Sequence, residues 1–236
     1  MRHREKFIVL DVEGMRGKRP YNVGYLIADR YGKIYAKHSF AFPVAIWENI
    51  AESLRIGQAV EMTKKNIQEI LQDADKPNRK RKYKFSTATE FTKIFIKEIK
   101  KHKIKRIFAY NVNFDKKAIR NLIGAAAFDS LNVQWCDIIS GILTTKLLTK
   151  DYINFCLTHD YLTPTKIASY KAEIVYRYLF GDLSFEEEHT GLEDALIEYM
   201  ILLVCFKSHK KLDFTPTCAW QKLKRFMKDK GLGAVG

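Results

Sequence analysis

Three apolar segments near the start of the chain predict β-strands in succession. The first, Phe7 to Leu10, contains no polar residue, which is typical of a strand buried on both faces of a sheet. The segments Tyr21 to Ala28 and Ile34 to Phe42 follow, separated by turn residues around Gly32. We therefore expect a three-strand antiparallel meander that ends before Pro43.

After Pro43 the spacing of apolar residues changes to the period of amphipathic helices. The positions expected on buried helix faces are Ile46, Trp47, Ile50 and Leu54, followed by Val60, Met62, Ile67, Ile70 and Leu71. The segment closes in KPNRKRKYK, residues 76–84, which contains six basic residues and no acid. This stretch fits a solvated loop and a phosphate-contacting loop equally well. We interpret residues 43–86 as a helical and basic insertion.

Helices and strands alternate in the second half of the chain, which indicates an α/β fold. Thr87 and Glu90 have capping-box spacing, so a helix should begin there, before a strand over Ile104 to Tyr110. A short strand is expected over Val133 to Cys136. Further helices are predicted over residues 137–148, 152–162 and 167–180, the last stopped by Gly181. With the meander, this order predicts a mixed sheet flanked by helices.

The tail, residues 210–236, is basic and predicts one helix over Pro216 to Lys230, with Trp220, Leu223 and Met227 on its buried face. It is expected to pack on the domain or to extend a basic surface.

The composition of the chain indicates a polyanionic partner. The 236 residues include 41 Lys and Arg against 27 Asp and Glu, a net charge of +14, which favours nucleic acid over an anionic membrane surface. No apolar run approaches the roughly 20 residues that span a bilayer. The cysteines Cys136, Cys156, Cys205 and Cys218 form no C-x-x-C motif. We expect a soluble cytoplasmic protein with free thiols and no membrane association.

Carboxylates stand at the ends of several predicted elements. Asp11 and Glu13 follow the first apolar run, and alternate residues of a strand point to the same side, so their head groups should converge. Converging carboxylates suit a hard divalent cation, although a solvated acidic turn also fits. Asp115 follows the strand at 104–110. With Asn113 as the N-cap, it would lie in the first helical turn, where an acid is favourable in any case.

The segment HTGLED contains a second capping-box spacing. Thr190 is the expected N-cap of a long apolar helix, which puts His189 before the cap and Asp194 at the fourth helical position. These two positions touch, and in many helices they hold a pair of apolar side chains. A structural pairing of His189 with Asp194 is one interpretation. A functional site near the helix N-terminus is the other.

Taken together, these residues resemble a known family, the DEDDh 3′–5′ exonucleases of the RNase H-like superfamily, which includes proofreading exonucleases and RNase T. The D-x-E of the first strand resembles the first motif, NVNFD with Asp115 the second, and HTGLED the third. His189 lies five positions before Asp194, as in this subgroup, whereas the sister subgroup would carry a tyrosine where this chain has Thr190. The likeness covers about Lys6 to Phe206. One departure is Gly14, where many members carry a hydroxyl residue.

The resemblance implies an RNase H-like exonuclease domain over residues 1–209 and a helical tail after it. Asp11, Glu13 and Asp194 would hold one Mg²⁺ or Mn²⁺, Asp11 and Asp115 a second, and His189 would be the general base. Single-stranded DNA or RNA would be cut from its 3′ end to nucleoside 5′-monophosphates.

Two other hypotheses compete with this one. A catalytically inactive nucleic-acid-binding module on the same fold is disfavoured by the intact set of acids. A membrane-surface protein ranks lower, because no amphipathic anchor is evident.

Overall fold

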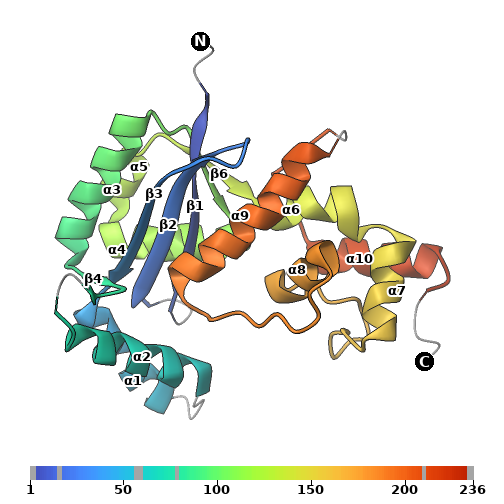
Figure 1. Cartoon of the computed structure of the whole chain (residues 1–236), viewed down its shortest axis with the longest axis horizontal. Helices are drawn as coiled ribbons and strands as arrows, with labels where there is room; N and C mark the ends of the chain where they lie inside the picture. Colours follow the sequence, from blue (N-terminus) through green and yellow to red (C-terminus); the bar gives the residue numbers. More distant parts are fainter. Residues whose placement is uncertain (1–3, 15–17, 56–60, 78–79, 209–210, 233–236) are drawn as a thin grey trace.

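The fold is built on a six-stranded mixed sheet. The computed structural model describes residues 4–14, 18–55, 61–77, 80–208 and 211–232. Its strands lie in the order β4-β3-β2-β1-β5-β6, with helices on both faces (Figure 1). They are β1 (Lys6–Glu13), β2 (Asn22–Asp29), β3 (Ile34–Ala41), β4 (Lys84–Phe85), β5 (Arg106–Ala109) and β6 (Gln134–Asp137). The first three pair antiparallel and the other pairings are parallel. The predicted α/β class, mixed sheet and meander are confirmed.

The helices contribute to two hydrophobic cores, one on each face of the sheet (Figure 1). One core receives α1 (Pro43–Arg55), α2 (Glu61–Ala74), α3 (Ala88–His102), α4 (Val112–Ile123) and α5 (Ala125–Asp129). The other receives α6 (Ile138–Ile142), the π-helix η2 (Leu143–Leu147), α7 (Lys150–Thr158), α8 (Ala172–Phe180), α9 (Gly191–Lys207) and α10 (Ala219–Asp229).

β1 lies between the two cores and is buried on both faces, as its apolar run predicts. Phe7 and Val9 belong to the core on the α9 side, and Ile8 and Leu10 belong to the core on the other side. All four are at most 1% exposed. Since side chains alternate along a strand, Asp11 continues the row of Phe7 and Val9. The first acid of the D-x-E pair therefore lies on the α9 face.

The N-terminal turn of α9 lies directly on β2 because two glycines let the backbones meet. A Cβ atom on Gly24 would lie only 1.9 Å from the backbone nitrogen of Leu192, and a Cβ atom on Gly191 would lie 2.5 Å from the nitrogen of Gly24. The backbone N–H of Gly191 donates to the Asn22 side-chain oxygen at 2.8 Å. Because Asn22 is itself on β2, this bond fixes the start of α9 over the centre of the sheet.

Two predicted helices in the second half are shorter than expected. α7 ends at Thr158 and α8 begins at Ala172, whereas the spacing of apolar residues predicted helices up to 162 and from 167. Between them Leu162 and Ala168 form an antiparallel bridge. Pro164 lies within this bridged turn, and proline cannot donate a helical hydrogen bond. The stop at Gly181 is confirmed, since this glycine caps α8 with a φ of 71°.

Of the side chains predicted to be buried, those of Leu54, Val60 and Met62 lie outside the part of the chain that the structure describes. Some of the others are exposed. They are Trp47, Leu71 and Trp220, with 65%, 42% and 43% of their surface accessible. In α10 the inward positions are Ala219, Leu223 and Met227, at a spacing of four residues, so the adjacent Trp220 is turned outward. The expected burial of Leu223 and Met227 is confirmed, and α10 packs into the same core as α9.

β4 was not predicted, because it lies in the segment 43–86 and is only two residues long. It pairs with Phe40 and Ala41 of β3. The preceding part of the outer β3 edge pairs with no strand of the described residues. This short strand joins the basic segment to the sheet and leaves part of the sheet edge open.

All four cysteines are free thiols, as predicted, with Cys218 exposed and the other three buried. Within the described ranges, every helix is too short or too polar to cross a bilayer.

Candidate metal centre

The end of β1 and the first turn of α9 bring three carboxylates together. Asp11, Glu13 and Asp194 each present one carboxylate oxygen, and these oxygens all lie within 4.8 Å of one another. The two acids of β1 lie side by side because alternate strand residues share a face. Asp194 reaches them because α9 begins directly over β2. This triad has the geometry of a site for a divalent cation.

A cavity of about 500 Å³ opens beside the triad. Asp11 and Asp194 line it, and so do Asp115 and His189. Glu13 is not among its lining residues, although its carboxyl group hydrogen-bonds to that of Asp194. Four of the five residues predicted for the site thus border one cavity, and the fifth contacts one of them.

Asp115 reaches the cavity from the first turn of α4. The N-cap of this helix is Asn111 and not Asn113, so the predicted helix start is two residues late. The Asn111 side chain makes no capping bond. Instead, the Asp137 carboxylate accepts from the backbone N–H of Val112 at 3.4 Å. A distant carboxylate at the end of β6 therefore sets the helix start, which local spacing does not reveal.

His189 stands immediately before α9 with a φ of 53°, in the left-handed region that non-glycine residues seldom adopt. Thr190 is confirmed as the N-cap, but its hydroxyl donates to the Glu193 carboxylate at 2.6 Å and does not cap the backbone. The His189 Nδ1 atom lies 3.8 Å from a carboxylate oxygen of Glu187. His189 is thus held beside an acid that the sequence motif does not include.

Burial and mutual repulsion raise the pKa of each acid at the centre. Burial, and then the neighbouring carboxylate of Asp115, hold the pKa of Asp11 well above its usual range. Burial raises the pKa of Asp115 to about 8, and burial with the charge of Asp11 raises the pKa of Asp194 to about 9. The pKa of Glu13 is raised by burial and then by Asp11. The cluster therefore retains protons at neutral pH unless a cation offsets its charge.

Three carboxylate oxygens at this centre are buried without a hydrogen-bond donor among the described residues. They are Asp11 Oδ2, Asp115 Oδ1 and Asp194 Oδ1. A buried acceptor left unpaired costs about 1 to 3 kcal/mol, and more when it is charged. A hard divalent cation coordinates such oxygens and supplies the missing charge. The residues present therefore fit a metal ion.

Glu198 is a buried acid that the sequence analysis missed. It lies one helical turn after Asp194 on α9, lines the same cavity, and accepts a hydrogen bond from the backbone N–H of Tyr110 at 3.2 Å. Burial, and then the charge of Asp11, hold its pKa well above the usual range. The four-residue spacing from Asp194 on a largely apolar helix was the signal that could have identified it.

Glu187 is a second missed acid of the cavity. Its carboxylate accepts a backbone hydrogen bond from Glu173 in the first turn of α8, and burial raises its pKa to about 7. It belongs to a run of three glutamates, in which no pattern distinguishes the one that turns inward.

No protein-family model matches the chain, and no curated protein is similar to it in sequence.

Proposed function

We propose that the protein is a metal-dependent 3′–5′ exonuclease that hydrolyses single-stranded nucleic acid ends and releases nucleoside 5′-monophosphates. The observation that carries this proposal is the convergence of Asp11, Glu13 and Asp194, with unpaired buried oxygens, beside Asp115 and His189. The motif resemblance of the same five residues supplies the direction of cleavage. A meander extended by parallel strands supports the RNase H-like assignment that the resemblance implies.

The carboxylates would act as ligands of two Mg²⁺ or Mn²⁺ ions. Asp11, Glu13 and Asp194 would hold one, and Asp11 with Asp115 the other. When bound, such a pair activates water and offsets charge on the attacking and leaving oxygens. The raised pKa values of these acids agree with a cluster that is stable in its ionised form only when positive charge is present.

His189 is suited to accept the proton of the attacking water. Burial lowers its pKa below the ordinary value, so the imidazole is neutral at pH 7. The Nδ1 atom lies 3.8 Å from a carboxylate oxygen of Glu187, so the ionised form of this acid would stabilise a proton on Nδ1 and leave Nε2 as the proton acceptor. Glu187 is itself held by a hydrogen bond from the first turn of α8.

The cavity also has groups that suit a nucleotide. Phe114 and Tyr170 line it and offer aromatic faces on which a base can stack, and Lys171 offers a cation for a phosphate. The net charge of +14 agrees with a polyanionic substrate.

The decisive experiment is degradation of 5′-labelled single-stranded DNA and RNA of matched sequence with Mn²⁺, Mg²⁺ or EDTA. The wild type should give a ladder that shortens from the 3′ end, and both EDTA and Asp11→Ala should abolish it. Asp75→Ala, which removes an exposed acid directly after the end of α2, should cleave like the wild type.

Intact oligonucleotides in the presence of either metal would contradict the proposal. Intact oligonucleotides that still bind the protein would indicate a binding module without catalysis.

A further inference from the structure

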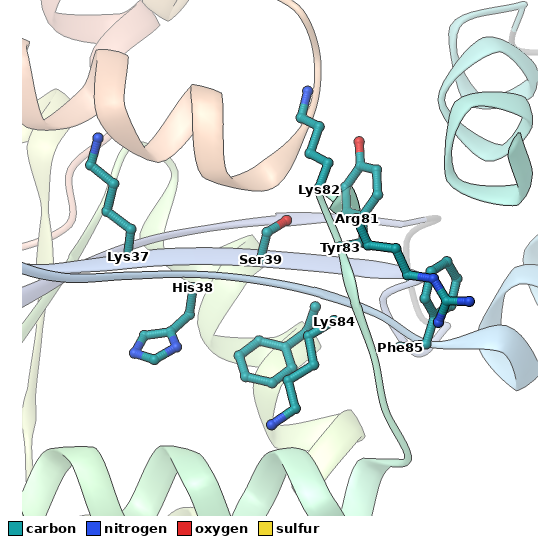
Figure 2. A pocket seen from close by; sticks show the side chains of 9 residues that line it. Lys37, His38, Ser39, Arg81, Lys82, Tyr83, Lys84 and Phe85 are labelled. Atoms are coloured by element: carbon teal, nitrogen blue, oxygen red, sulfur yellow. The ribbon is translucent and has the colours of Figure 1, made fainter. Parts of the chain in front are cut away.

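A second cavity, of about 460 Å³, lies at the β3 edge of the sheet (Figure 2). Its walls come from residues 37–40 of β3 and from residues 81–85, the end of the basic segment and β4. Four of the lining residues are cationic, namely Lys37, Arg81, Lys82 and Lys84. Among the described residues no acid lines it, in contrast to the cavity at the metal centre.

The lining residues of this cavity lie on both faces of the sheet edge, with Lys37, Ser39 and Lys82 on the α9 side and His38 and Lys84 on the opposite side (Figure 2). The α9 side of this cavity and the metal centre lie on either side of the first turn of α9. Ser39 pairs with Gly24 across β3 and β2, and Gly24 pairs with Asp11 across β2 and β1. Residues paired directly across strands share a face of the sheet, so Ser39 and Asp11 are on the same face. The N-terminal turn of α9 rests on Gly24 between them. The basic cavity is therefore separate from the metal centre.

Two hydroxyl groups at this cavity have no hydrogen-bond partner among the described residues. They belong to Ser39 and Tyr83, whose side chains are 7% and 3% exposed. Figure 2 shows that both point to the α9 side of the sheet, with Lys37 and Lys82. Unpaired buried hydroxyls are unfavourable, and stability alone would favour alanine and phenylalanine at these positions. Both oxygens are buried, so a ligand gains these two donors when a side chain that covers them moves aside.

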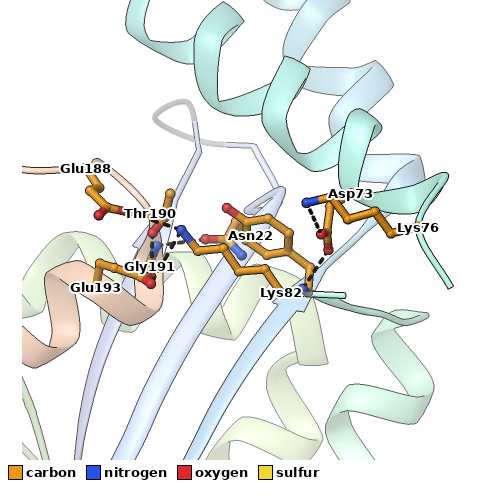
Figure 3. Close-up of polar contacts among 9 residues, drawn as sticks. Asn22, Asp73, Lys76, Lys82, Glu188, Thr190, Gly191 and Glu193 are labelled. Atoms are coloured by element: carbon orange, nitrogen blue, oxygen red, sulfur yellow. Dashed lines mark hydrogen bonds and ion pairs between the residues drawn. The ribbon is translucent and has the colours of Figure 1, made fainter. Parts of the chain in front are cut away.

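The charge at this cavity is only partly compensated. Lys82 pairs with Glu188 at 3.2 Å and with Glu193 at 3.4 Å (Figure 3). Arg81 donates to the backbone carbonyls of Ala74 and Lys76. Lys37, by contrast, forms no ion pair with any carboxylate of the described residues, so a net positive charge remains.

The wall that carries Tyr83 is held in place by Asp73 of α2. The Asp73 carboxylate accepts from the backbone N–H of Tyr83 at 2.9 Å and pairs with Lys76 at 3.1 Å (Figure 3). The hydroxyl of Tyr83 and the ammonium of Lys82 therefore belong to a segment whose backbone is held in place.

We propose that this cavity binds a phosphate group, with the hydroxyls of Ser39 and Tyr83 donating to its oxygens and Lys37 supplying positive charge. A tetrahedral oxyanion accepts several hydrogen bonds at once and prefers charged donors. The phosphate comes either from a nucleic acid strand that continues past the metal centre, which rests on the proposed function, or from a free phosphate ion.

The test uses the full chain carrying Asp11→Ala, in EDTA, so that nothing is cleaved. One arm measures binding of a fluorescent single-stranded oligonucleotide by anisotropy, and the other measures binding of inorganic phosphate by calorimetry. In this background Ser39→Ala, Tyr83→Phe and Lys37→Gln are compared with Lys224→Gln, which removes the same charge from the exposed face of α10.

Each of the three cavity variants should weaken binding about tenfold, the size of one charged hydrogen bond, while Lys224→Gln should stay within about twofold. Ser39→Ala and Tyr83→Phe should keep or raise the Tm, since each removes an unpaired hydroxyl. A lower Tm would mean that the hydroxyls are structural and would overturn the proposal.

The two arms separate the sources of the phosphate. Weakening in the oligonucleotide arm assigns the cavity to the strand, and weakening in the phosphate arm alone assigns it to the free ion. If neither arm distinguishes the cavity variants from Lys224→Gln, the proposal is wrong. Because no cleavage is measured, this result is independent of whether the protein is an exonuclease.

Discussion

The metal centre and the basic cavity are opposite in charge, but both contain buried polar atoms without a hydrogen-bond partner. At the metal centre, Asp11, Asp115 and Asp194 have buried oxygens without donors. At the β3 edge, Ser39 and Tyr83 have buried hydroxyls without partners. One site lacks positive charge and the other lacks an acceptor. Unsatisfied buried groups thus occur at both sites, whereas the overall charge of +14 would indicate only the basic one.

The largest effect is expected at the metal centre from His189→Asn, a residue that tolerates the positive φ of this position. Losing the proton acceptor should lower the rate by about 10² to 10⁴-fold. Glu187→Gln, which keeps the shape of the orienting side chain, should cost about tenfold. Initial rates at saturating Mn²⁺ would show both.

Because burial lowers the pKa of His189, the acid limb of the wild-type rate profile should lie below the ordinary value of about 6.5. Oligonucleotide binding in EDTA serves as the control and should not change in either variant. A His189→Asn enzyme with the wild-type rate would exclude His189 as the base.

The next largest effect is expected on the stability of the metal-free protein, through the acids of the metal centre. The folded pKa values of Asp115 and Asp194, about 8 and about 9, lie above the ordinary value near 3.9, so the folded state binds more protons. Their stabilising protonation is complete below about pH 4 and is lost as pH rises through 8 and 9. The Tm in EDTA should therefore fall from pH 5 to pH 9.

Added Mn²⁺ should reverse this loss, by about 3 kcal/mol at a hundredfold excess over its Kd. The gain should grow with pH, because protons and metal compete for the same oxygens. Asp194→Asn, as the matched variant, should flatten the pH dependence and reduce the gain. An equal gain at pH 5 and pH 9 would contradict the assignment.

A smaller effect is expected at Gly24, where the first turn of α9 separates the metal centre from the basic cavity. Gly24→Ala would push a methyl group into the backbone of Gly191 and should cost about 1 to 3 kcal/mol in urea unfolding. Because the first turn of α9 carries Asp194 and His189 directly precedes the N-cap, cleavage should also slow. Gly181→Ala is the control: its φ is 71° and its Cβ would contact nothing, so it should cost about 1 kcal/mol and leave the rate unchanged. Equal rates in both variants would mean that the position of α9 does not matter for cleavage.

The smallest effect is expected from Lys82→Gln, which breaks the ion pairs to Glu188 and Glu193 across the boundary between the sites. All three side chains are 30% or more exposed, so the loss in unfolding free energy should stay below about 1 kcal/mol. Thermal unfolding at low and high salt measures it. A loss well above this would show that Lys82 anchors α9.

What the sequence predicted correctly depends on short-range chemistry. The strand acids Asp11 and Glu13 share a face because of the two-residue period of a strand, and Thr190 marks the start of α9 because a capping residue and an apolar run lie within a few positions. The capping box of Thr87 and Glu90 is likewise confirmed, with both of its hydrogen bonds formed.

What the sequence did not predict depends on contacts between distant segments. The start of α4 is set by Asp137, and the position of α9 is set by the meeting of Gly24 with Gly191. Glu187 is distinguished from its neighbouring glutamates only by the location of α8. In these cases the deciding partner lies far away in the chain, where no spacing rule reaches.

The docking of α9 on β2 also has a consequence for the order of folding. β1, β2 and β3 are neighbours in sequence and can pair early, since their contacts close short loops. Asp194 meets Asp11 only when α9 arrives from the far end of the chain. The repulsion among the acids therefore opposes the docking of α9, which is a late step. A divalent cation should speed this docking or slow the undocking of α9, and it should not change the rate at which β1, β2 and β3 pair.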